Sequence, residues 1–311
     1  MNSKRHPLHA VGLIAAASLL LSPIWIVTPS PATAEVLFDH VDATASTPVV
    51  SQFPIDFPNE GAAAHDDFTI PAGEVWSPQR LFIDGSASGT ATSAEFGYQL
   101  YRGNGPPVSS NTVYGDKLNP LAGTAWPDAT LDVHIGGVLA PGNYLLGAEA
   151  FIARNPGANY WYWQANDELF GAPAFWQENG AYGTGCVASP MPRSSACLPG
   201  TGPDQSFRLE GIRAPDQLEV IRVKARKNAR LRLEVSVPTC CGIDLKSAQM
   251  NTKAGVIPHE IGPFTFKLQP KAKTLRQVEA GQKVLATVQM RTPAIVGLGS
   301  PTATIVKRLK R

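Results

Sequence analysis

HDDFTIPAGEVWSPQRLFIDG, the stretch from His65 to Gly85, decides the fold class of this chain. Apolar residues alternate at Phe68 and Ile70, a Pro-Ala-Gly triplet follows, and the apolar pattern resumes at Trp76. An alternation with period two is typical of a strand with one buried face, and Pro and Gly between two such runs indicate a turn. The stretch therefore predicts two consecutive strands of an antiparallel β-sandwich.

The same pattern recurs at short intervals, whereas no ten-residue stretch after Glu35 has an apolar helical stripe with capping residues. With 311 residues, including 28 Gly and 27 Pro, the chain is long enough for two domains rich in turns. We therefore predict an all-β protein, with a jelly-roll-like antiparallel β-sandwich over residues 35–213 and a smaller immunoglobulin-like or cadherin-like β-sandwich over 214–311. Further strands are expected at Glu95–Tyr101, Tyr144–Phe151, Tyr160–Trp163, Phe207–Gly211, Leu231–Val237, Phe264–Leu268, Val284–Met290 and Thr302–Val306.

Residues 1–34 have the features of a cleavable signal peptide. Lys4 and Arg5 precede an apolar run over residues 10–27, and Ala32-Thr33-Ala34 supplies a small-residue cleavage pattern. The alternative is a membrane anchor, since the run is about as long as the roughly 20 residues that a bilayer requires, but Pro23 interrupts it. We expect a secreted protein, extracellular or associated with the cell surface, with no transmembrane anchor in the mature chain.

The charge of the chain is divided into two opposite halves. Residues 35–221 contain 7 Lys and Arg against 21 Asp and Glu, a net charge of −14, whereas residues 222–311 contain 18 against 4, a net charge of +14. The basic half lacks the interleaved aromatic residues of nucleic-acid-binding surfaces, because only Phe264 and Phe266 occur in it. Anionic cell-wall polymer or lipid headgroups are therefore the expected partners, unless the basic face is only solvated or attracts the acidic domain.

Several motifs occur in a fixed order along the first domain: Asp66–Gly73 (DDFTIPAG), Trp76, Leu100-Tyr101-Arg102, Leu139–Tyr144 (LAPGNY), Phe175-Trp176 and Phe207–Gly211 (FRLEG). In this order they resemble the β-sandwich domain of secreted bacterial proteins that often carry cell-surface anchoring signals, and the resemblance covers Phe38 to Gly211. The second domain resembles the basic β modules that end many secreted actinobacterial-type proteins in its pattern of residues at Phe264, Leu268, Gly281, Lys283 and Val284. These resemblances imply a fold and a location rather than an activity.

Acidic residues indicate one candidate metal site. Asp66 and Asp67, with Asp204, could supply oxygen ligands to a structural Ca²⁺. The alternative is a solvated turn or cap, since neighbouring side chains in a strand point to opposite faces. No other cofactor is expected.

Aromatic residues indicate one candidate ligand surface. Tyr160, Trp161, Tyr162 and Trp163, with Trp176, could present rings on which sugars stack. In a strand, however, one alternating pair faces the core, so at most two of the first four are available.

Export makes disulfide bonds chemically permitted, and we favour a bond between Cys186 and Cys197, which bracket a short loop. Closing this loop would stabilise the fold by roughly 3 kcal/mol in the chain-entropy model. Cys240 and Cys241 are neighbours, so a bond between them would be strained, and pairing them with the other two would link the domains. No His lies at ligand spacing from either cysteine pair, which argues against a zinc site there.

No catalytic constellation is apparent. The mature chain has four His residues and no G-x-S-x-G motif, so a nucleophile activated by a His is not indicated. We therefore expect an exported, non-catalytic binding or structural protein that recognises carbohydrate or wall polymer. The alternative is a carbohydrate-active hydrolase that uses two acids of the first domain, because the separation of such acids is spatial and 21 acids give many pairs.

Overall fold

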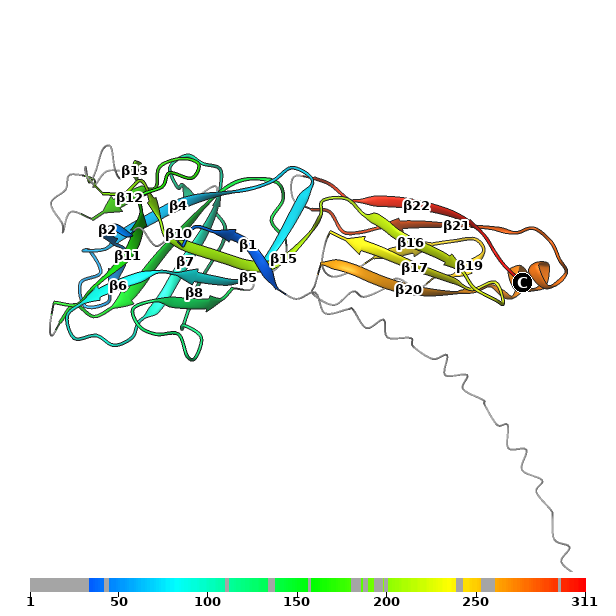
Figure 1. Ribbon diagram of the computed structural model, residues 1–311, viewed down its shortest axis with the longest axis horizontal. Coiled ribbons are helices and arrows are strands. Elements are labelled where there is room, and N and C mark those ends of the chain that lie inside the picture. The colour runs from blue at the N-terminus through cyan, green and yellow to red at the C-terminus, as the bar shows by residue number, and fades with distance from the viewer. Residues whose placement is uncertain are drawn as a thin grey trace, which may run out of the picture.

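The computed structural model of the chain consists of two bodies of β-strands that lie end to end (Figure 1). The N-terminal body contains β1 to β15, and the C-terminal body contains β16 to β22 and the single described helix. The structure describes residues 34–41, 45–109, 112–133, 138–155, 158–179, 186, 190–192, 198, 201–238, 243–252, 261–295 and 298–311.

Three sheets build the N-terminal body, and almost all of their strand pairs are antiparallel; the described exception is the parallel pair of β3 and β10. The four-stranded sheet contains β1 (Glu35–Asp39), β15 (Phe207–Pro215), β5 (Glu74–Ile83) and β9 (Ala129–Asp132) in this order. The seven-stranded sheet contains β13 (Met191–Pro192), β12 (Phe175–Glu178), β4 (Ala62–Ile70), β3 (Gln52–Pro54), β10 (Gly142–Ile152), β7 (Glu95–Arg102) and β8 (Thr112–Leu118). The third sheet contains β14 (Asp204–Gln205), β11 (Tyr160–Asn166) and β2 (Ala45–Val50), and β6 (Gly85–Ser88) also pairs with β11.

The stretch from His65 to Gly85 joins two of these sheets. Its first half lies in β4 of the seven-stranded sheet and its second half in β5 of the four-stranded sheet. The connecting turn contains Gly73 at φ +90°, a conformation that a side chain would strain. Across the core, the rings of Phe68 and Trp76 lie parallel with centroids 6.1 Å apart. The two strands therefore supply facing layers of one hydrophobic core.

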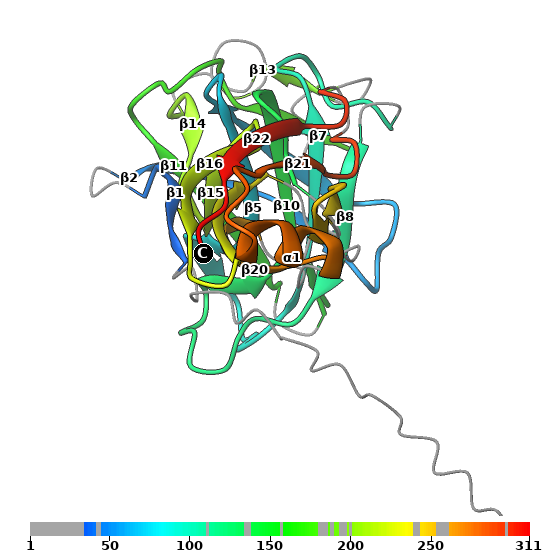
Figure 2. The same cartoon turned by 90° about the vertical axis from the view of Figure 1, so that its right-hand side faces the viewer.

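The C-terminal body has two sheets and a separate core. One sheet contains β16 (Glu219–Ala225), β17 (Leu231–Val237), β20 (Gly262–Pro270) and β19 (Met250–Asn251), and the other contains β18 (Asp244–Lys246), β21 (Leu285–Arg291) and β22 (Thr302–Arg308). Leu233, Val235, Ala286 and Val288 are fully buried in the cluster that joins them. Helix α1 (Ala272–Glu279) lies at the end of this body that is remote from β1 to β15 (Figure 2).

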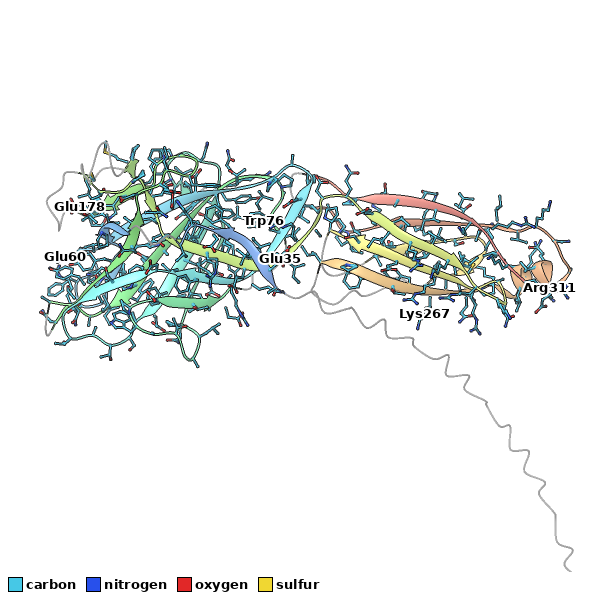
Figure 3. All side chains as sticks on the ribbon, in the orientation of Figure 1. Glu35, Glu60, Trp76, Glu178, Lys267 and Arg311 are labelled. Carbon is cyan, nitrogen blue, oxygen red and sulfur yellow. The ribbon has the colours of Figure 1, made fainter. Side chains whose placement is uncertain are left out.

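A small apolar cluster connects the two bodies. Val75, Ile212 and Ala214 of the N-terminal body pack with Ile261 and Ile295 of the C-terminal body. Trp76 and Glu35 lie near this junction, whereas Glu60, Glu178 and Arg311 lie at the remote ends (Figure 3). No helix in the described ranges is long and apolar enough to cross a membrane.

The prediction of an all-β fold built from stacked antiparallel sheets is confirmed. The eight-residue helix α1 was not predicted, because it is shorter than the ten-residue window in which an apolar stripe was sought. The jelly-roll and immunoglobulin-like types, and the boundary at residues 213 and 214, stay predictions. Nearly all of the expected signal peptide, residues 1–33, lies outside the described residues.

Candidate functional site

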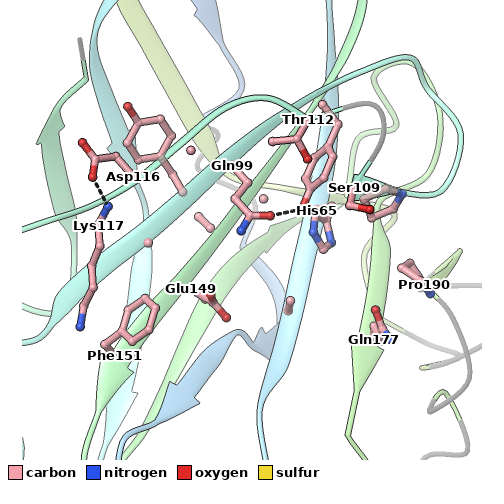
Figure 4. A pocket seen from close by; sticks show the side chains of 18 residues that line it. His65, Gln99, Ser109, Thr112, Asp116, Lys117, Glu149, Phe151, Gln177 and Pro190 are labelled. Atoms are coloured by element: carbon pink, nitrogen blue, oxygen red, sulfur yellow. Dashed lines mark hydrogen bonds between the residues drawn. The ribbon is translucent and has the colours of Figure 1, made fainter. Parts of the chain in front are cut away.

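A groove of about 660 Å³ lies on the face of the seven-stranded sheet that is turned away from the core (Figure 4). Strands β4, β7, β8, β10 and β12 all contribute to its lining. In β4 the alternation sends Ala63 and His65 to the groove, while Phe68 belongs to the core. The groove and the core thus use opposite faces of the same strands.

Glycines on neighbouring strands form the floor of the groove. Gly147 of β10 lies opposite both His65 of β4 and Gln99 of β7, and Gln99 in turn lies opposite Gly115 of β8. A Cβ atom on Gly147 would lie 2.6 Å from His65 Cδ2. A Cβ atom on Gly97, in the adjacent row, would lie 2.7 Å from Phe151 Cε2. Large side chains therefore alternate with glycines across the strands, and each large side chain packs over a glycine of the neighbouring strand.

Polar side chains stand beside the glycines. The Tyr101 hydroxyl donates a hydrogen bond to Gln99 Oε1 (Figure 4). Burial raises the pKa of the Glu149 carboxyl. The pKa of the Tyr101 hydroxyl is also raised, mainly by burial and secondarily by the charge of Glu149. Glu149 thus carries its proton to a higher pH than an exposed glutamate does.

His65 supplies a neutral imidazole to the groove wall. The side chain is 6% exposed, and burial lowers its pKa to about 4. Its ring meets the Tyr101 ring edge to face, with centroids 5.6 Å apart. Within the described part of the chain, its Nδ1 atom has no hydrogen-bond partner. The nitrogen itself is buried, so His65 contributes chiefly the edge of an uncharged ring to the groove wall.

Charged and aromatic residues form one rim of the groove. The Lys117 ammonium lies 4.0 Å from the centroid of the Phe151 ring and 2.6 Å from Glu95 Oε2. The Asp116 carboxylate accepts a hydrogen bond from the Lys117 backbone N–H at 2.7 Å (Figure 4). This rim offers an apolar ring beside groups of both charges.

The aromatic ligand surface expected on β11 requires correction. Trp161 and Trp163 are 0% exposed and Trp176 is 2% exposed, so these three side chains belong to the core. Their indole N–H groups donate to the carbonyls of Pro127, Ser206 and Val50, respectively. Tyr160 and Tyr162 are half-buried on the other face, with ring centroids 6.2 Å apart. The expected surface is therefore reduced to two tyrosines.

The three acids expected to form one metal site separate into two places. Asp66 and Asp204 lie together in the interior, both 0% exposed. Asp67 is buried at a different place, where its carboxylate accepts the Ala172 N–H at 3.1 and 3.2 Å. His40, which the sequence did not indicate, takes its place beside the other two acids.

Cys186 is 2% exposed and takes part in a disulfide bond. Cys197, Cys240 and Cys241 lie outside the described residues, so the expected pairing of Cys186 with Cys197 stays a prediction.

A row of cations crosses the sheet of the C-terminal body. Lys224 of β16 lies opposite Arg232 of β17, which lies opposite Lys267 of β20. Figure 3 shows Lys267 on the outside of β20. Desolvation and the charges of Arg222, Arg226 and Arg232 lower the pKa of Lys224, and a nearby acid, Glu234, offsets this only in part. Like charges directly opposite each other on adjacent strands are unfavourable, so an anionic partner would stabilise this row.

Sequence reasoning missed the groove, although a signal was present. Gly97, Gln99 and Tyr101 alternate on β7, and Gly147, Glu149 and Phe151 alternate on β10. A glycine followed at every second residue by polar and aromatic residues indicates a strand face that is hollow and not apolar. Hydrogen bonding, ring stacking and proton donation are the chemistry available there. No protein-family model and no curated protein matches the chain.

Proposed function

We propose that this protein is an exported, non-catalytic binding protein that recognises carbohydrate in the groove of the seven-stranded sheet. The observation that carries the proposal is the glycine floor at Gly97, Gly115 and Gly147, bounded by amide, phenol, carboxyl and aromatic groups. Sugars present hydroxyls at their edges and C–H groups on their faces, so a groove with both polar groups and rings suits them. The volume of about 660 Å³ is within the range of small-ligand sites.

Each class of side chain has a separate task in this proposal. Gln99 and Gln177 present amide groups that can donate to and accept from sugar hydroxyls. Phe151 supplies an apolar ring on the rim, and Glu149 and His65 present groups whose charge burial suppresses. With Glu149 and His65 uncharged, the interior of the groove favours an uncharged glycan over an ionic ligand, and the charged groups lie on the rim.

A glycan array with the purified protein tests this proposal directly, followed by calorimetry on any glycan that binds. Gln99→Ala removes an exposed groove amide and should weaken binding roughly tenfold, as expected for the loss of a hydrogen bond worth about 1.4 kcal/mol. Tyr162→Ala is the matched control, since Tyr162 lies on β11 and does not line the groove. Binding that is lost with Tyr162→Ala and kept with Gln99→Ala would place the ligand on β11 instead.

A carbohydrate-active hydrolase is the alternative from a different class, and one observation favours it. Glu149, with its raised pKa, lines the same groove as a second acid, Asp116. A glycosidase needs one protonated carboxyl group and one carboxylate. Product analysis of the bound glycan separates the two functions, because intact glycan supports binding alone and cleavage that Glu149→Gln abolishes supports the hydrolase.

The cation row suggests a second binding function, attachment to an anionic cell-wall polymer. Lys224, Arg232 and Lys267 lie on adjacent strands about 4.8 Å apart, so that successive anionic groups of one polymer can reach successive cations. Co-sedimentation with anionic wall polymer should decrease as salt rises, since the Debye length falls from about 10 Å at 0.1 M to about 3 Å at 1 M. Sedimentation that Arg232→Gln leaves unchanged at low salt would argue against this attachment.

A further inference from the structure

Three titratable side chains from distant parts of the chain meet in the interior of the N-terminal body. They are His40, which follows β1, Asp66 of β4 and Asp204 of β14. One ligand atom of each lies within 4.8 Å of those of the other two, and the exposed fractions are 8%, 0% and 0%. The His40 Nδ1 atom lies 4.0 Å from Asp204 Oδ2.

Backbone groups hold the two carboxylates in place. Asp66 Oδ2 accepts the Gln205 N–H at 2.7 Å, and Asp66 Oδ1 accepts the Asp67 N–H at 2.9 Å. Asp204 Oδ2 accepts the Phe170 N–H. The aromatic rings of Phe38 and Phe170 lie next to the His40 ring, with centroids 6.1 and 5.8 Å from it. The three donor groups are thus oriented by fixed partners in a dry environment.

Two carboxylates so close together in the interior repel each other unless a proton or a cation lies with them. Two ionised carboxylates and a neutral imidazole carry a charge of −2, which a divalent cation balances. We propose that His40, Asp66 and Asp204 bind one divalent transition-metal ion, with Zn²⁺ as the favoured ion. This site is independent of the proposed groove, because Asp66 contacts the core side of β4 and His65 the groove side.

The donor set distinguishes Zn²⁺ from the Ca²⁺ expected from the sequence. Calcium takes six to eight oxygen ligands, whereas zinc takes nitrogen and oxygen ligands and is commonly four-coordinate. One imidazole nitrogen and two carboxylates are ligand types that zinc accepts, and three ligands leave a fourth position open. The ion would connect the end of β1, the centre of β4 and β14, which are segments far apart in the sequence.

The test is a titration of the untagged, chelator-treated protein with ZnCl₂, followed by calorimetry and thermal unfolding. We expect one Zn²⁺ per chain, a higher melting temperature with zinc, and little competition from excess CaCl₂. Asp66→Asn should weaken zinc binding by more than about 100-fold, the upper end of what loss of a merely supporting residue costs. Asp67→Asn is the matched control. The Asp67 carboxylate accepts the Ala172 N–H outside the proposed site, so zinc binding should not change in this variant.

Two results would overturn the zinc site. The first is wild-type protein that takes up no zinc, or takes up calcium in preference. The second is Asp66→Asn protein that binds zinc as the wild type does, which would show that Asp66 is not a ligand of the bound zinc. His40→Gln provides a second variant if Asp66→Asn does not fold, and cobalt substitution provides an absorption spectrum that should report tetrahedral nitrogen and oxygen ligation. Glycan binding by the groove does not enter any of these measurements.

Discussion

His65 of β4 and Gly147 of β10 lie directly opposite each other, and the imidazole occupies the space that a Cβ atom on the glycine would need. A built Cβ would lie 2.6 Å from His65 Cδ2 and 2.9 Å from Nε2. His65 therefore packs directly over Gly147, which it can do because residue 147 has no side chain.

Gly147→Ala should reduce the free energy of unfolding by about 1–3 kcal/mol, because the added methyl group forces a buried side chain to move. His65→Ala in the same chain should recover part of this loss, and a double-mutant cycle by urea denaturation measures the coupling. Gly105→Ala is the control, since nothing lies within 4 Å of a Cβ atom there. Equal stability of Gly147→Ala and the wild type would show that His65 moves freely.

Glu149 makes a pH-dependent contribution to stability whose sign follows from its environment. Burial raises the pKa of the folded-state carboxyl above its value in the unfolded chain, so the folded protein binds more protons in the interval between the two pKa values. Stability should therefore fall as the pH rises through this interval. Glu149→Gln removes the charge and should unfold at a higher temperature than the wild type at pH 7, with the difference shrinking as the pH falls toward 4. A difference in unfolding temperature between the two proteins that grows as the pH falls would contradict a raised pKa of Glu149 in the folded state.

The strands could be predicted from the sequence because one face of most of them is apolar, and β17, with Leu231, Leu233 and Val235 buried, is the simplest example. The groove could not be predicted, because its rows depend on the register of β4, β10, β7 and β8, whose residues are up to about 80 positions apart. The pattern within each strand indicates which residues share a face, but not which strands lie together.

The charged pair Asp66 and Asp67 illustrates the same limit. Alternation correctly predicts that the two side chains point in opposite directions. It does not decide which of them joins the cluster with Asp204, since both carboxylates are buried and each finds its own backbone donor, Gln205 for Asp66 and Ala172 for Asp67. His40 joined this cluster through the pairing of β1 with β15, a contact for which a single sequence offers no signal.

The alternation of β11 predicts unequal effects along the aromatic run. Trp163→Ala should reduce the free energy of unfolding by about 3–5 kcal/mol, because it removes a fully buried ring and the hydrogen bond from its indole N–H to the Ser206 carbonyl at 2.8 Å. Tyr162→Ala, one residue earlier on the outward face, should cost about 1 kcal/mol or less. Chemical denaturation of both variants measures the difference, and equal losses would mean that both faces of β11 are covered.

Arg232 lies between two other cations, and this position predicts a gain of stability on its removal. Lys224 lies opposite it on one neighbouring strand and Lys267 on the other. Because like charges directly opposite each other are destabilising, Arg232→Gln should raise the urea midpoint at low salt. The gain should disappear near 1 M salt, where the Debye length is about 3 Å and the wild-type repulsion is already screened. Lys246→Gln is the matched control, since Lys246 of β18 lies opposite the neutral Gln289 and its removal relieves no repulsion. Equal gains for both variants would mean that lower net positive charge stabilises the C-terminal body as a whole, and the row itself would then require no anionic partner.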